Sequence, residues 1–313
     1  MILDPTAGGD VRQDWRAKRL AAMAVLCVAI TWGVSFAVVK ATVGTVSPSR
    51  LVGWRFAVAT FALFTLRPRV LGELDRRTVG RGTVLGALLG IGFVLCTIGM
   101  QTTSVLISAF VVGTTVVFAP LIAWIWLRRR LTIRAAAAVL LALLGLAMIT
   151  VRSLAVGPGT LLILTAAVLW AVHLVALERW SRAGRPYGLT LVQLATSAVV
   201  ALGCQALLDD WQGLWPPMSV SAAAGIVFLG AAATGGAFVT LSWAQTHLDT
   251  TTTAVILSLE PLVGASLGVA LGDPCTATTL AGAIAVLTAV YLVARPRAGT
   301  SGIRPGAVLR RPE

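Results

Sequence analysis

The chain has 313 residues, of which 57% are hydrophobic and only 12% are charged. A water-soluble protein of this length would expose large apolar patches at such a composition, so an ordinary soluble domain is excluded. The formal net charge of +13 would by itself suggest a nucleic-acid partner, but the cations lie in short groups between long apolar stretches. We therefore expect the lipid bilayer as a partner and no nucleic acid.

Ten apolar stretches follow one another from Leu20 to Ala294, and each is about long enough to cross a hydrocarbon core of ~30 Å as a helix. We expect an all-α polytopic membrane protein with transmembrane helices at 20–39, 51–66, 82–100, 105–127, 134–151, 160–178, 188–208, 220–243, 252–271 and 276–294. These stretches divide the chain into an N-terminal tail (1–19), a first five-helix repeat (20–151), a second five-helix repeat (152–294) and a C-terminal tail (295–313).

The positions of the cations predict the orientation of these helices. Most Lys and Arg residues lie in the two tails or in alternate connections, whereas Lys40, Arg50 and Arg152 lie at the opposite ends of the helices. Because cytoplasmic segments of membrane proteins are enriched in Lys and Arg, we expect both termini in the cytoplasm and the protein in the cell membrane. The connection at 244–251 has no Lys or Arg and gives this topology its weakest support.

No cofactor or metal is expected. Cys27, Cys96 and Cys204 fall inside apolar stretches and Cys275 stands alone, so the spacing fits neither a disulfide framework nor a set of metal ligands. The sequence contains no phosphate-binding loop and no H-E-x-x-H motif. ATP-driven transport by this chain alone is therefore not expected.

The two halves of the chain resemble each other. Aromatic and polar residues recur at a nearly constant offset: Trp32 with Trp170, Lys40 with Glu178 and Arg55 with Gln193 at 138 residues, Pro120 with Pro261 at 141, and Gln101 with Gln245 at 144. Each half has five predicted helices, an odd number, so the second copy would enter the bilayer from the opposite side. Inverted repeats of this kind form the two alternative openings of many secondary transporters.

Two charged residues inside predicted helices are candidates for polar recognition. Glu260 is the acidic residue that lies well within a helix, where a carboxyl group can couple protons, bind a substrate ammonium or bridge helices structurally. Arg55 lies about one turn inside its helix and could extend to the membrane interface, pair with Glu260 or bind a substrate carboxylate. Lys40, at a helix end, is an interfacial anchor, with a gate-lining role as the alternative.

Trp32 and Trp170 lie near the middle of their helices rather than at the ends. Because they are repeat equivalents, we expect them on opposite sides of one central cavity; filling of the space between helices is the alternative. His173, three residues after Trp170, could exchange protons near neutral pH or act as a neutral hydrogen-bonding group. Gln193 could bind substrate, although a bridge between helices is the simpler interpretation.

Several short motifs occur in a characteristic order along the chain: Trp32, Gly33, Phe36 and Lys40; Arg55 and Phe56; Pro120; Trp170; Gln193; and Leu259, Glu260 and Pro261. In these residues the chain resembles the drug/metabolite transporter superfamily, in its EamA-type branch. The resemblance implies a ten-helix secondary transporter that exports a small metabolite, an amino acid or a drug-like compound. The family's usual Glu is missing from two turns, which read Leu127–Leu131 and Gly272–Pro274 here.

We expect alternating access to a cavity between the halves, driven by protons or by the substrate's own gradient. The candidate substrate-binding residues are aromatic for apolar contact or ionisable for polar recognition: Trp32, Phe36, Arg55, Trp170, His173 and Glu260. Two other functions remain open. An intramembrane lipid-modifying enzyme would need several acid, base or metal-binding groups at one depth, whereas in a non-transporting scaffold or sensor the buried polar residues would be structural only.

Overall fold

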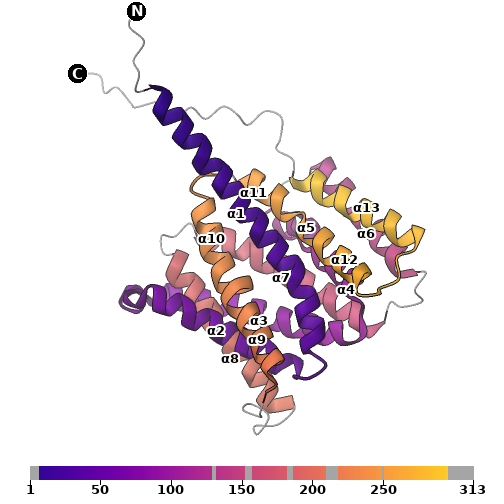
Figure 1. The fold of residues 1–313 in the computed structure, drawn as a ribbon, viewed down its shortest axis with the longest axis horizontal. Helices are drawn as coiled ribbons and strands as arrows, with labels where there is room; N and C mark the ends of the chain where they lie inside the picture. The colour runs from indigo at the N-terminus through magenta and orange to yellow at the C-terminus, as the bar shows by residue number, and fades with distance from the viewer. Residues whose placement is uncertain are drawn as a thin grey trace, which may run out of the picture.

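A computed structural model describes residues 7–128, 132–151, 157–181, 186–208, 218–248 and 250–294. All regular secondary structure in these residues is helical (Figure 1), as the sequence predicts. The helices are α1 (Ala7–Thr42), α2 (Pro48–Leu66), η1 (Pro68–Glu73), α3 (Arg76–Thr102), α4 (Val105–Gly113), α5 (Thr115–Leu127), α6 (Ile133–Val151), α7 (Pro158–Ser181), α8 (Pro186–Leu208), α9 (Val220–Val227), η3 (Phe228–Gly236), α10 (Ala237–Ala244), α11 (Thr250–Leu257), α12 (Glu260–Ala270) and α13 (Ala277–Ala294).

Helical structure covers each of the predicted membrane-crossing stretches. In the described part of the chain, six helical segments are long and apolar enough to cross a membrane: Arg16–Thr42, Arg76–Thr102, Val105–Leu127, Pro158–Trp180, Pro186–Leu207 and Val220–Ala244. Shorter apolar helices lie at Ile133–Met148 and Ala277–Leu292. The structure is therefore that of a multi-pass helical membrane protein.

The ends of the chain differ in part from the prediction. α1 begins at Ala7, so most of the expected N-terminal tail is a continuation of the first helix. The expected C-terminal tail at 295–313 lies outside the described residues.

Three of the predicted stretches are interrupted helices. Pro261 has no N–H to donate to the carbonyl of Leu257, and α11 ends at Leu257. Pro120 is the repeat equivalent of Pro261, and the stretch that contains it is divided at Thr114 into α4 and α5. The third interruption is the π-helical segment η3, between α9 and α10. Such wide turns occur frequently at functional sites.

The bundle has two ends, which we name after Lys40 and Arg67. At the Lys40 end, Asp273 between α12 and α13 accepts a hydrogen bond from the backbone N–H of Leu106 at 2.8 Å, which satisfies the start of α4. Gly159 at the start of α7 lies against the end of α3 there. α1 therefore ends where α7, the first helix of the second half, begins. The two halves run through the bundle in opposite directions.

Contacts between the halves repeat under exchange of the two copies. α1 contacts η3 and α10, and its counterpart α7 contacts α3; α1 also contacts α12, and α7 contacts α4 and α5. Three further contacts join a helix to its own counterpart, namely α2 to α8, α4 to α12 and α6 to α13. In Figure 1, α1 runs across the front of the molecule, with α10 on one side of it and α12 on the other. An inverted duplication is expected to produce such equivalent contacts in the two halves.

Glycines allow the closest of these contacts. Gly82, Gly86 and Gly90 of α3 lie against α8, and a Cβ atom at Gly86 would collide with the carbonyl oxygen of Gln193. Small residues at such positions let helix backbones approach in lipid, where no hydrophobic effect drives one helix against another. Close approach of α3 and α8 brings the interior residues of both halves together.

Candidate functional site

Arg55 is a buried cation in the middle of the bundle. Its side chain is only 6% exposed, and its Nε donates a 2.9 Å hydrogen bond to Oγ1 of Thr234 in the π-helical segment η3. The Thr234 hydroxyl in turn donates to the carbonyl of Leu229 at 2.8 Å. The alternative that Arg55 extends to the membrane interface is therefore wrong, because its guanidinium is turned inward and held by the second half.

An aromatic contact path continues from Arg55. Its guanidinium carbon lies 4.6 Å from the ring centroid of Phe93 on α3 and 5.9 Å from that of Phe56, within the range of cation–π attraction. The Phe93 ring lies 4.7 Å from Trp170 on α7 and 5.0 Å from Phe56, centroid to centroid. Through Phe93, Arg55 of the first half is thereby connected to Trp170 of the second half.

Glu260 is the acidic partner of this cation. It is the first residue of α12 and is partly buried, and the positive end of the helix dipole favours a carboxylate at that position. No direct ion pair between Glu260 and Arg55 occurs among the described residues.

Trp32 and Trp170 make equivalent hydrogen bonds across the two halves. Nε1 of Trp32 donates to the carbonyl of Ala233 at 2.7 Å, and Nε1 of Trp170 lies 3.5 Å from the carbonyl of Leu89. The acceptors Leu89 and Ala233 are themselves 144 residues apart, the offset that also relates Gln101 to Gln245. Both side chains are partly exposed, and the indole N–H group of each lies near a carbonyl of the other half.

Hydrogen bonds and ring contacts link Arg55 to Thr234, Phe93 and Trp170, and Trp32 bonds to the residue before Thr234. Together with the acidic Glu260, these residues form what we call the central group: Trp32, Arg55, Phe93, Trp170, Thr234 and Glu260. It draws on α1, α2, α3, α7, η3 and α12 and therefore lies between the two halves. Four of its members are predicted site residues.

The structure places the other two predicted site residues outside the central group. Phe36, one turn after Trp32 on α1, is buried toward the Lys40 end, where Gly264 of α12 lies against it. His173 is buried on α7, and its Nε2 lies 2.9 Å from Oε1 of Gln193 on α8. Phe36 and His173 thus lie on opposite sides of the central group along the bundle.

Phe93 and Thr234 were missed by the sequence reasoning. Thr234 is the only polar residue in the run Gly230–Gly236, and a lone hydroxyl within a glycine- and alanine-rich helical stretch is a signal that could have been used. Phe93 has no such signal, because a phenylalanine in an apolar helix is equally suited to lipid or to the interior.

Lys40 donates hydrogen bonds to the end of a neighbouring helix. Its Nζ donates to the carbonyl of Met100 at 2.6 Å and to that of Thr103 at 2.8 Å, both at the carboxyl end of α3. Carbonyls at a helix end lack intrahelical partners, and a cation there also interacts favourably with the helix dipole. Lys40 therefore joins α1 to α3 at the Lys40 end of the bundle.

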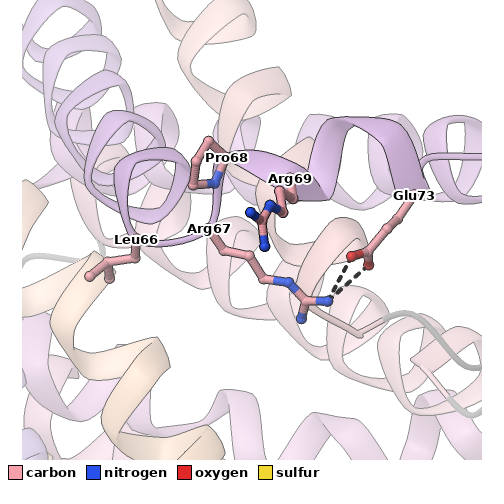
Figure 2. A pocket seen from close by; sticks show the side chains of 5 residues that line it. All are labelled: Leu66, Arg67, Pro68, Arg69 and Glu73. Atoms are coloured by element: carbon pink, nitrogen blue, oxygen red, sulfur yellow. Dashed lines mark hydrogen bonds and ion pairs between the residues drawn. The ribbon is translucent and has the colours of Figure 1, made fainter.

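A surface pocket at the Arg67 end is separate from the central group. Figure 2 shows its lining, from Leu66 to Glu73, in which Nη2 of Arg67 pairs with Oε1 of Glu73 at 2.7 Å. Both side chains are about half exposed, so solvent screens this ion pair and its contribution to stability is small. The pair shapes the turn between α2 and α3.

Comparison with known proteins gives matches along both halves of the chain. The model of the EamA-like transporter family matches it twice, at residues 19–151 and 157–295. The uncharacterized transporter YyaM of Bacillus subtilis (strain 168) is 26% identical over 284 residues, which cover 85% of this chain and 90% of that protein. An uncharacterized transporter of Archaeoglobus fulgidus is 28% identical over 278 residues, with coverages of 88% and 86%.

A solved crystal structure aligns with 88% of this chain and 96% of its own at a TM-score of 0.59. At 21% sequence identity this likeness shows a shared fold.

Proposed function

The chain belongs to the EamA-like transporter family, and from this membership we propose that it is a secondary transporter that moves a small molecule by alternating access. We propose ten membrane-crossing helices in two inverted groups of five, at 20–151 and 152–294, in the cell membrane with both termini in the cytoplasm. The antiparallel course of the halves and the distribution of cations support this topology. The family and the names of the relatives point to a transporter rather than an enzyme.

The central group carries the proposal, because it places a buried cation, an acidic group and two partly exposed indoles between two helix bundles. The guanidinium of Arg55 is bonded through Nε, which leaves its terminal nitrogens to bind a carboxylate or a similar anionic group of the substrate. Glu260 receives a substrate ammonium or a proton. Trp32 and Trp170 contact the apolar part of the substrate, and Phe36 and His173 flank it toward the two ends.

Export is the direction we propose, with either the proton gradient or the substrate's own gradient as the source of energy. Charged residues inside a membrane bundle are costly and therefore mark substrate or ion pathways. Glu260 is the residue through which protons would be coupled, because it is the acidic member of the central group and forms no ion pair among the described residues.

Counterflow in proteoliposomes tests the proposal. Candidate substrates are found by ligand-induced thermal stabilisation of the purified protein, and the wild-type protein should then exchange labelled for unlabelled substrate. Arg55→Gln should abolish this exchange, whereas Arg67→Gln, which removes an exposed arginine at the end of the same helix, should not. Chemical conversion of the substrate would indicate an enzyme instead, and the absence of both flux and conversion would favour a scaffold or sensor.

A further inference from the structure

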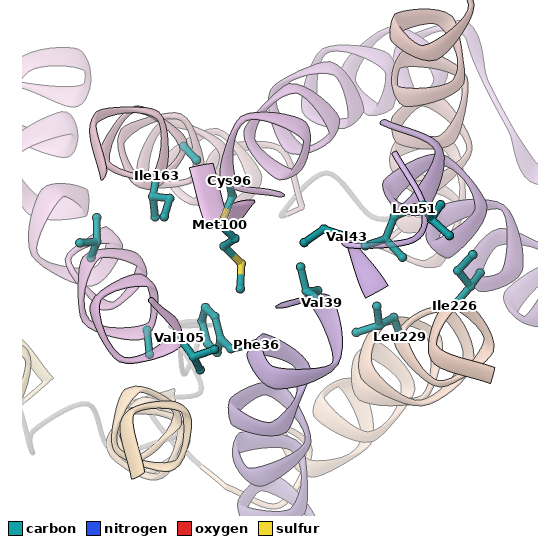
Figure 3. Packing of buried hydrophobic residues seen from close by; sticks show 14 of the residues in the cluster. Phe36, Val39, Val43, Leu51, Cys96, Met100, Val105, Ile163, Ile226 and Leu229 are labelled. Atoms are coloured by element: carbon teal, nitrogen blue, oxygen red, sulfur yellow. The ribbon is translucent and has the colours of Figure 1, made fainter. Parts of the chain in front are cut away.

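The Lys40 end of the bundle is sealed by one continuous apolar cluster. Its buried members come from both halves and include Phe36, Val39, Leu51, Cys96, Met100, Ile163 and Leu229. In Figure 3, Phe36, Val39 and Met100 point into the space between the surrounding helices. The cluster, which we call the sealed layer, extends from the Lys40 end to Trp170 of the central group, which packs against it.

The equivalent layer at the Arg67 end is divided. Leu51, Ile163 and Leu229 lie together in the Lys40-end cluster, and the repeat offsets of 138 and 144 residues relate them to Leu189, Val25 and Leu85.

At the Arg67 end these three counterparts belong to two different clusters. Val25 packs with Ala21 and Ala244 on α1 and α10, whereas Leu85 and Leu189 pack with Ala176 on α3, α7 and α8. Residues at equivalent positions of the two repeats therefore belong to one cluster at the Lys40 end and to two separate clusters at the Arg67 end.

Phe36 and its counterpart Leu174 show the same difference. Phe36 is 7% exposed, and Leu174, 138 residues later, is 42% exposed. In an inverted repeat, exchange of the two halves converts one open end into the other. The asymmetry is what a state closed at the Lys40 end and open toward the Arg67 end would show.

Lys40 bridges the two sides of the sealed layer. It extends from α1, which packs with α9 at this end, to the carbonyls of Met100 and Thr103 on α3. Its repeat counterpart is Glu178, and an ionised carboxylate cannot donate hydrogen bonds to carbonyl oxygens. The same bridge therefore cannot form at the Arg67 end, and the two ends are unequal by sequence.

We infer that Lys40 is a latch that holds the Lys40 end closed and favours the state open toward the Arg67 end, which is the cytoplasmic side in the proposed topology. The inference rests on the proposed function, because a latch matters only if the two ends open in turn. Lys40 is a positioning residue in this cycle and does not contact the substrate.

The native thiol of Cys96 is a reporter inside the sealed layer, where it is 5% exposed. In a protein that keeps Cys96 while Cys27, Cys204 and Cys275 are replaced by serine, a membrane-impermeant maleimide is added from the Lys40 side. Lys40→Met should raise the rate of Cys96 labelling by about tenfold or more. Lys40→Arg, which keeps a cationic donor, should stay near the parent rate, as should Lys18→Met, the control at the other end of α1.

A second reporter makes the test independent of unfolding. In a cysteine-free protein, Leu174→Cys introduces a thiol that should react from the Arg67 side and should react several-fold more slowly when Lys40→Met is added. A protein with Cys275 alone, in the exposed turn before α13, identifies the side of the membrane that the Lys40 end faces.

Reciprocal changes, with position 96 faster and position 174 slower, support the latch. Three results overturn it: unchanged labelling of Cys96 in Lys40→Met, equal opening by Lys40→Arg, or faster labelling at both positions, which would indicate general loosening. Labelling needs no substrate, so it reports on the latch separately from flux. If Arg55→Gln loses flux while the reciprocal labelling is unchanged, the substitution affects the binding site and leaves the latch intact.

Discussion

Arg55→Gln is the most informative single change, because Arg55 connects the halves and carries the proposed anion site. The substitution removes a hydrogen bond from a charged donor to Thr234, for which about 1.5–3 kcal/mol is typical, and the cation–π contact with Phe93, for which ~0.5–2 kcal/mol is typical. Removing a buried charge also recovers part of its desolvation cost. We expect a net loss of roughly 1–3 kcal/mol in the free energy of unfolding.

The expected effect on substrate binding is larger than the effect on folding. A paired, charge-assisted contact between the guanidinium and a substrate carboxylate contributes about 2–3 kcal/mol, which corresponds to roughly 30- to 150-fold in Kd. Isothermal titration with a substrate and with its carboxamide analogue measures this contribution directly. The wild-type protein should prefer the carboxylate by that factor, and Arg55→Gln should bind the two ligands about equally.

Two controls define how the reasoning could fail. Thr234→Val keeps the side-chain volume and removes the acceptor for Nε, so it should weaken binding by less than Arg55→Gln does. Arg67→Gln should leave Kd unchanged, because Arg67 lies at the Arg67 end, away from the central group. If Arg55→Gln weakens the carboxylate and the carboxamide by the same factor, Arg55 does not bind the anionic group and its role is structural.

Three further predictions concern coupling and packing. Glu260→Gln should abolish pH-driven flux in proteoliposomes while substrate exchange persists; pH-driven flux at the wild-type level would exclude Glu260 as the coupling group. Gly86→Ala should lower the free energy of unfolding by ~1–3 kcal/mol because its Cβ meets α8, whereas Gly80→Ala on the same helix, where nothing lies within 4 Å, should be neutral or stabilising in thermal unfolding. Asp273→Ala should destabilise the protein by about 0.5–2 kcal/mol through loss of the acceptor for Leu106, and an unchanged midpoint of unfolding would show that water replaces the carboxylate.

The helical course of the chain was predictable from hydropathy, because each apolar stretch is long enough to be recognised without knowledge of its neighbours. The break before Glu260 was also readable in principle, since Pro261 removes a specific backbone donor. The π-helical segment η3 was not, because its register depends on packing against α2, where Gly230 lies against the backbone of Arg55.

Side-chain direction was the main limit on predicting the site. An arginine one turn inside a helix can reach either the interface or the interior, and the rotation of α2 decides between them. That rotation is set by contacts such as Gly53 against Leu202 of α8, which hydropathy does not reveal. The equivalence of Trp32 and Trp170 could be predicted from the sequence because it depends on the duplication. The hydrogen-bond partners of Lys40 could not, because predicting them requires knowledge of which helix end lies beside α1.

The two indole hydrogen bonds end on main-chain oxygens, at Ala233 and Leu89. A carbonyl oxygen is supplied by every amino acid, so mutation at either acceptor position changes the side chain and leaves the acceptor in place. As the two copies diverged, these hydrogen bonds could persist while the side chains at the acceptor positions were replaced. A sequence comparison of the acceptor positions would then miss the interaction, because only the donor tryptophans are identifiable from the sequence.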